Sequence, residues 1–288
     1  MAEALMTSAN QEATRGLVRR TLTRLSHTGE VPALPGIATA ALAMARDPDA
    51  NTGELCKLIR VDIGLAARIL RWANSIVYAR RTPARTLQDA VVTLGLRKTC
   101  DVLVTTCTRQ LFAVSSGRGR ELWNHALAVA IAMEQLAEVT RKVDPAVAFL
   151  PGLFHDVGRI AFAITDGPAF DLIEEMAAAR GDRCALEQEW YGFDHAEAGA
   201  SLARDWGVDA ELCDAIRWHH QPVEAESGRT LAQLINAADA LAYAAGLGAG
   251  AEPTPEVRLT DLGIPEGDHE IHANRLREAF AHQTALFG

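Results

Sequence analysis

The segment FLPGLFHDVGRI, from Phe149 to Ile160, brings His155 and Asp156 together at the end of an apolar run. Neighbouring residues on a regular helix point about 100° apart, so one helical face cannot present both side chains. Both can reach one ion, or two adjacent ions, where the backbone turns or a helix ends, and Gly158 permits such a turn. Imidazole and carboxylate groups are common ligands of first-row divalent metals. The pair therefore suggests a metal site, whereas a capping Asp156 with a hydrogen-bonded His155 is the structural alternative.

The composition of the 288-residue chain favours helices. Hydrophobic residues make up 49% of the sequence, but aromatic residues only 6%, and alanine and leucine outnumber the residues that prefer strands. The length is ample for a buried core. We therefore predict an all-α fold, a multi-helix bundle.

Charge, cysteines and hydropathy limit the possible partners and location. The net charge of -9 argues against nonspecific binding to nucleic acid. The five scattered cysteines form no CxxC pair, which favours reduced thiols in the cytoplasm. The N-terminus lacks the apolar core of a signal peptide, and the best apolar run, Leu231–Ala251, contains Asn236 and Asp239. We expect a cytoplasmic protein that binds neither membrane nor nucleic acid.

Helix-capping residues and one linker divide the chain into four parts. Asn51, Asp62 and Thr86 each precede an amphipathic stretch, as N-cap residues do. The Ser115–Gly119 stretch is rich in serine and glycine, which is typical of a linker. The predicted parts are an N-terminal arm or helix (1–28), an N-terminal helical lobe (29–115), a second helical lobe (116–248) and a turn-rich C-terminal segment ending in a helix (249–288).

Further candidate ligands occur on other predicted helices. These residues are His125, with Glu121 one turn before it, His195, the tandem His219 and His220, and Asp239. Each has a structural alternative, such as a cap or a hydrogen-bonded core residue. Together they are better explained by a shared ion, because a buried unpaired carboxylate costs several kcal/mol. Several helices that each direct a histidine or aspartate inward are typical of a metal site in a helical bundle.

The ordered set His125, His155-Asp156, His195, His219-His220 and Asp239 resembles the signature of the HD superfamily of metal-dependent phosphohydrolases. Motifs of the predicted first lobe resemble, more specifically, the N-terminal half of the HDOD family, the HD-related output domains. Those motifs are Asp62-Ile63-Gly64-Leu65, Leu70-Arg71-Trp72-Ala73-Asn74-Ser75 and Ala90-Val91-Val92-Thr93-Leu94-Gly95. The second half adds Leu122-Trp123-Asn124-His125 and Phe154-His155-Asp156-Val157-Gly158-Arg159. The resemblance covers about residues 25 to 245 and implies an HD-like helical core in the second lobe.

The resemblance also implies roles for these residues, by analogy with the related HD-GYP phosphodiesterases. His125, His155, His195 and one of His219 and His220 would bind metal. Asp156 would bridge two divalent ions, of iron, manganese, nickel or zinc, and Asp239 would complete one coordination sphere. Glu121 stands where some relatives place an extra carboxylate ligand. In an enzyme, Asp156 and Arg159 would be the catalytic residues, with Arg159 contacting a phosphate.

Two departures affect the functional interpretation. Arg159 replaces a lysine that is common after the HD pair, and the Gly-Tyr-Pro signature of the cyclic-di-GMP phosphodiesterases is missing after His220. We therefore favour a bacterial signal-transduction output or scaffold module that binds a protein partner or a nucleotide. The alternative is a metal-dependent phosphohydrolase acting on a cyclic dinucleotide or nucleotide. A third possibility is a helical protein whose buried histidines are satisfied without any ion.

Overall fold

The computed structural model describes residues 34–78, 82–114, 117–251 and 254–287. Helices account for all the regular secondary structure in these ranges, so the all-α prediction is confirmed. The predicted N-terminal arm (1–28) lies outside the described residues.

The first lobe consists of short helices that begin at the predicted caps. Its helices are α2 (Gly36–Arg46), α3 (Thr52–Ile59), α4 (Ile63–Ala73), α5 (Leu87–Leu94) and the longer α6 (Leu96–Val114). Asn51 and Asp62 accept hydrogen bonds from backbone amides of α3 and α4. Thr86 and Asp89 form the complete capping box at α5. Gly95, at a φ of 81°, ends α5 in a conformation that favours glycine.

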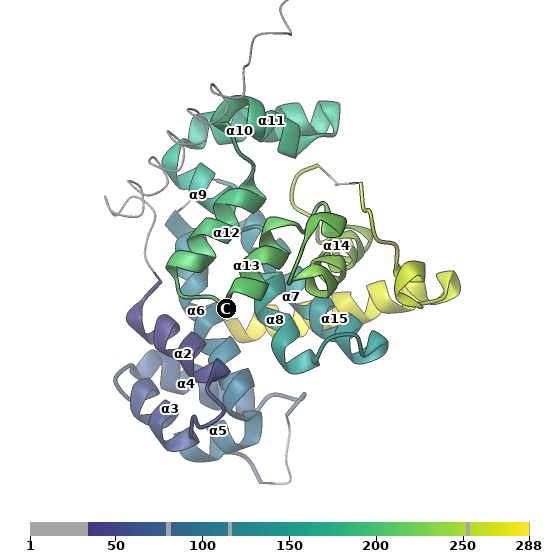
Figure 1. Cartoon of the computed structure of the whole chain (residues 1–288). Helices are drawn as coiled ribbons and strands as arrows, with labels where there is room; N and C mark the ends of the chain where they lie inside the picture. The colour runs from purple at the N-terminus through teal and green to yellow at the C-terminus, as the bar shows by residue number, and fades with distance from the viewer. Residues whose placement is uncertain (1–33, 79–81, 115–116, 252–253, 288) are drawn as a thin grey trace, which may run out of the picture.

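The second lobe is built around one long buried helix. Its helices are α7 (Gly119–Thr140), α8 (Pro145–Phe154), α9 (Val157–Thr165), α10 (Gly167–Arg180), α11 (Arg183–Tyr191), α12 (His195–Asp205), α13 (Ala210–Arg217) and α14 (Arg229–Ala244). Helix α7 packs against α8 and α14, and α12 packs against α9 and α13. Figure 1 shows α10 and α11 at the end of the molecule opposite α2–α5.

Within the described residues, one stretch, Pro145–Thr165, is long and apolar enough to cross a membrane when only its length and composition are considered. It comprises α8 and α9, and 83% of its most apolar 18-residue window is buried inside the protein. The hydropathy of this stretch is therefore explained by its position in the core.

The C-terminal helix α15 (His269–Phe287) joins the two lobes, after the short 3-10 helices η2 (Leu259–Leu262) and η3 (Glu266–Asp268). It packs against α4 of the first lobe and α7 of the second, and Figure 1 shows it running into the middle of the molecule. The Phe287 ring lies 5.0 Å from that of Trp72 and 6.0 Å from that of Trp123. Arg68 and Arg109 both donate to the Phe287 carbonyl and so cap the end of α15.

Candidate metal centre

The His155-Asp156 pair lies where one helix ends and the next begins, as the dipeptide argument requires. Helix α8 ends at Phe154 and α9 begins at Val157, so both side chains project from the junction. Both residues are buried. Gly158 has a different role from the predicted one: a Cβ atom there would collide with the His195 carbonyl oxygen. The glycine therefore permits the close packing of α9 against α12 and so brings His195 to the pair.

The two carboxylate oxygens of Asp156 face two groups of histidines. Oδ1 lies 3.2 Å from Nε2 of His195 and 3.8 Å from Nε2 of His219. Oδ2 lies 3.6 Å from Nε2 of His155 and 3.8 Å from Nε2 of His125. One carboxylate thus lies between two sets of imidazole nitrogens, which is the arrangement expected of a group that bridges two ions.

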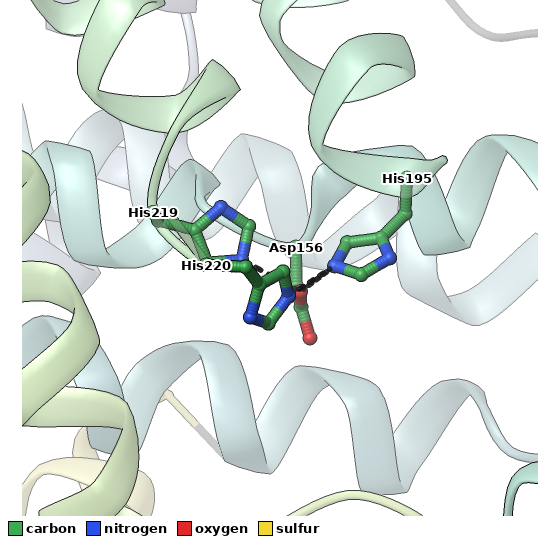
Figure 2. A group of neighbouring side chains, drawn as sticks. All are labelled: Asp156, His195, His219 and His220. Atoms are coloured by element: carbon green, nitrogen blue, oxygen red, sulfur yellow. Dashed lines mark hydrogen bonds and ion pairs between the residues drawn. The ribbon is translucent and has the colours of Figure 1, made fainter. Parts of the chain in front are cut away.

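Asp239 and the tandem histidines complete the two groups. Asp239 Oδ1 lies 3.1 Å from Nε2 of His125, a close approach that does not meet hydrogen-bond geometry. His220 Nε2 lies 2.9 Å from His195 Nε2. Figure 2 shows His195 reaching Asp156 from one side, and His219 and His220 from the other. Both tandem histidines therefore join the same group as Asp156 and His195.

Hydrogen bonds fix the orientation of four of the rings. In each ring Nδ1 faces an oxygen that can only accept, so Nδ1 carries a proton and Nε2 is the atom available to a metal. The bonds are His125 to the Leu247 carbonyl (3.1 Å), His155 to the Gly152 carbonyl (2.8 Å), His195 to the Glu187 carboxylate (2.6 Å) and His219 to the Ile216 carbonyl (2.8 Å). All four Nε2 atoms therefore face Asp156, as in metal-binding histidines.

The electrostatics favour a charged Asp156 carboxylate beside neutral His155 and His219, and a protonated His195 when no metal is bound. Burial lowers the pKa of His155, and burial together with His155 and His195 lowers the pKa of His219 to about 4. Burial alone would raise the pKa of Asp156, but His155 and Arg159 hold it well below its usual range. Burial also lowers the pKa of His195, but Glu187 and Asp156 outweigh it and raise that pKa to about 10. A metal bound by His195 would displace this proton.

The polar atoms of the centre are not satisfied by the protein alone. Nε2 of His155, Nε2 of His219 and Oδ1 of Asp239 are buried and have no hydrogen-bond partner among the described residues. Buried polar atoms without partners are costly. Imidazole nitrogens with carboxylate oxygens are a suitable donor set for iron, manganese, nickel or zinc. The residues therefore fit divalent ions, held by Asp156, His195, His219 and His220 on one side and by His125, His155, Asp156 and Asp239 on the other.

Two predicted site residues contact other groups. Glu121 lies outside both histidine groups: its Oε1 accepts from the Gly250 amide at 2.9 Å, and its Oε2 lies 3.5 Å from Arg118. Arg159 donates to Asp156 Oδ2 at 2.7 Å and to Glu174 at 3.0 Å, and its side chain is 1% exposed. The Arg159 guanidinium therefore neutralises two buried carboxylates within the protein.

Three charged residues that the sequence reading did not single out support the centre. Glu187, 1% exposed, also accepts from the His195 backbone amide at 2.8 Å and so fixes both the ring and the start of α12. Glu174 lies 3.0 Å from Nε of Arg183, which makes it the shared anion of two buried arginines. A carboxylate within a predicted amphipathic helix gives no sequence signal of burial, and these partners become visible only in three dimensions.

A backbone strap, Leu247–Ala251, covers this side of the centre. The Ala249 carbonyl accepts from Arg159 (3.0 Å), Arg183 (3.2 Å) and the Tyr243 hydroxyl (2.8 Å). The Ala251 carbonyl accepts from Arg183 and Tyr243 as well. The arginines that form ion pairs with Asp156 and Glu174 thus also donate hydrogen bonds to the strap.

An all-α bundle with a buried histidine–aspartate centre is the architecture of HD-type metal proteins. The family model described as HDOD domain matches residues 31–222, two thirds of the sequence, and the chain belongs to this family. Solved structures agree. An HDOD domain protein of unknown function from Geobacter sulfurreducens is 26% identical with a TM-score of 0.75, and the match covers 93% of this chain and 96% of that one.

Other similar proteins include two that are named as hydrolases. A Shewanella amazonensis protein provisionally named a phosphohydrolase is 26% identical with a TM-score of 0.68, covering 91% of this chain and 94% of that one. Ribonuclease Y of Thermus thermophilus is 33% identical over 130 residues, 45% of this chain but 17% of that enzyme. An uncharacterized Treponema pallidum protein is 25% identical over 195 residues, 66% of this chain and 38% of that protein. The chain thus spans well under half the length of these two relatives.

Proposed function

We propose that this protein is a signal-transduction output module that holds two divalent ions at Asp156 and uses its HDOD surface to bind a protein partner or a nucleotide. The observation that carries the metal assignment is the shared orientation of His125, His155, His195 and His219, whose Nε2 atoms all face Asp156. Four rings fixed in this way by unrelated oxygens are not explained by core packing alone. Such ions would supply charge and a coordination template.

The enclosure of the centre favours a binding module over a hydrolase. His155, His195 and His219 have no exposed surface, and Asp156 is 8% exposed. The buried Arg159 and Arg183 both donate hydrogen bonds to the Ala249 carbonyl of the strap. A partner that binds the outer surface needs no access to these buried ligands, whereas a substrate would have to reach the ions between them.

The second candidate is a metal-dependent phosphohydrolase. The bridging position of Asp156 supports it, because two ions placed at such a carboxylate activate water and orient a phosphate. Here Asp156 would hold the ions, and Arg159 would keep Asp156 ionised and oriented for them. Because the chain is similar to Ribonuclease Y, RNA should be tested as a substrate together with cyclic dinucleotides.

The two candidates are separated by a turnover assay on metal-loaded protein. Nucleotides, cyclic dinucleotides and a short RNA are offered to the wild type and to Asp156→Asn, and binding is measured in parallel by calorimetry. The proposed module retains its ions and shows no hydrolysis above that of the variant. Hydrolysis that Asp156→Asn abolishes would establish the phosphohydrolase instead.

A further inference from the structure

A second polar cavity, away from the metal centre, lies where the two lobes meet. Its volume is about 640 Å³, and its walls come from the junction of α5 and α6, from α7, from the start of α8 and from α15. Known small-molecule sites have volumes of roughly 300–1,000 Å³. None of the metal-centre residues lines this cavity. Its aliphatic and aromatic walls include Leu94, Ile131 and Tyr78.

Most of the charges in this cavity neutralise one another. Lys98 Nζ lies 2.6 Å from Glu134, and Arg275 donates to Glu138 at 2.8 Å. Asp101 has no such partner: it is 5% exposed, and no hydrogen bond to its carboxylate occurs among the described residues. Burial raises the pKa of Asp101 to about 7 although Lys98 and Arg97 lower it, and Glu134 contributes to the rise. The cavity therefore contains a carboxylate that lacks a donor.

Other polar groups of the cavity also lack partners. Gln135 is 5% exposed, yet its Oε1 atom has no hydrogen-bond partner in the described part of the chain. The same holds for Oε1 of Gln283 and Nδ1 of His282 on α15. All three residues line the cavity together with Asp101. Buried acceptors from α6, α7 and α15 thus surround a space that no protein donor fills.

We propose that this cavity binds a small organic ammonium compound, with the ammonium group donating to Asp101 and Gln135. An ammonium carries three N–H donors and a positive charge, which match the unpaired acceptors and the unneutralised carboxylate. The aliphatic walls suit a short methylene chain. Two sources share this chemistry, a diamine and an amino acid. In an amino acid the carboxylate would contact Arg97, which also lines the cavity.

The test is calorimetric titration of the full-length protein with putrescine and with L-lysine, and 1,4-butanediol is the neutral control. At least one ammonium compound should bind while the diol does not. The Asp101→Asn variant should weaken this binding at least about tenfold, the loss expected for a charge-assisted hydrogen bond. The matched control Asp49→Asn removes an exposed carboxylate and should leave binding unchanged.

Two further variants keep the test independent of folding defects. Ala279→Phe would fill the cavity from α15 and should block binding while the protein stays folded. Arg97→Gln should weaken lysine but not putrescine if the natural ligand is an amino acid. The proposal is overturned if neither ammonium compound binds at millimolar concentration, or if Asp101→Asn binds as well as the wild type does.

Discussion

The two lobes bury polar groups in opposite ways. In the first lobe, Thr99, Thr105 and Thr108 are buried on α6, and each hydroxyl donates at 2.6–2.7 Å to the carbonyl four residues earlier, which lies in α6 or, for Thr99, at Gly95 just before it. In the second lobe, several buried charged groups contact other helices: Arg159 of α9 bonds to Glu174 of α10, and Glu187 of α11 to His195 of α12.

The difference shows which lobe carries the chemistry. A hydroxyl satisfied within its own helix costs little to bury and imposes no tertiary geometry. Charged groups satisfied across helices are costly to bury and must be placed accurately, and proteins retain such arrangements mainly where they serve a site. Substitutions should therefore have local effects in the first lobe and far-reaching effects in the second.

The largest effect on stability should come from Arg159→Met. The variant keeps most of the side-chain volume but leaves Asp156 and Glu174 without the cation they share. Breaking a buried ion pair in this way costs about 3–5 kcal/mol. Urea unfolding of metal-free protein measures this cost. Arg118→Met, which removes a partly exposed cation beside Glu121, should cost less than about 1 kcal/mol. Equal effects of the two variants would contradict the contrast.

Glu187→Gln should weaken metal binding without abolishing it. The amide can no longer accept from His195 Nδ1 with a full negative charge, so the ring is held less firmly and is a weaker base. Loss of such a supporting carboxylate typically lowers metal affinity by about 10–100-fold. Competition with a chelator measures the affinity. Glu189→Gln, an exposed position on the same helix, is the control and should not change it.

Asp101 is the exception within the first lobe, and its effect depends on pH. Its pKa is about 7 in the folded protein, above the unfolded value of about 3.9, so between these values the folded state binds more protons. Its contribution to stability is thus present below about pH 4 and is lost as the pH rises through 7. Asp101→Asn should raise stability by about 2 kcal/mol at pH 8 and hardly at pH 4. Urea unfolding at both pH values checks this, and a gain that is the same at both would refute the shift.

The smallest effect should come from Thr105→Val. The isosteric change removes a hydroxyl that bonds only to the Asp101 carbonyl of its own helix. We expect a loss of less than about 1 kcal/mol in thermal unfolding, with metal content unchanged. A larger loss, or any loss of metal, would show that the first lobe is coupled to the centre more tightly than its hydrogen bonds indicate.

The sequence predicted the helices and the inward-facing histidines better than it predicted what supports them. Caps such as Asn51 and Asp62 act over three residues, so local patterns reveal them. The ligand residues followed from a family resemblance, and the structure brings His125, His155 and His195 around Asp156. The strap could not be predicted from the sequence, because it acts through backbone carbonyls, which every residue has.

Glu121 and Gly158 illustrate the same limit. Glu121 lies one turn from His125 on α7. Its carboxylate accepts a hydrogen bond from the Gly250 amide of the strap, and this contact sets its direction. Gly158 is needed for contact with α12, an element some forty residues further along the chain, and not for a turn. Local chemistry predicts a candidate, while the packing of distant elements decides its role.

The most direct test of the metal centre is the metal content of the purified protein, measured by mass spectrometry after expression without a metal-binding tag. About two divalent ions per chain are expected in the wild type, because Asp156 lies between two groups of ligands. Asp156→Asn should lose them, and the matched buried carboxylate variant Asp101→Asn should keep them. A folded wild-type protein that holds no stoichiometric ion after incubation with iron, manganese, nickel or zinc would contradict the assignment.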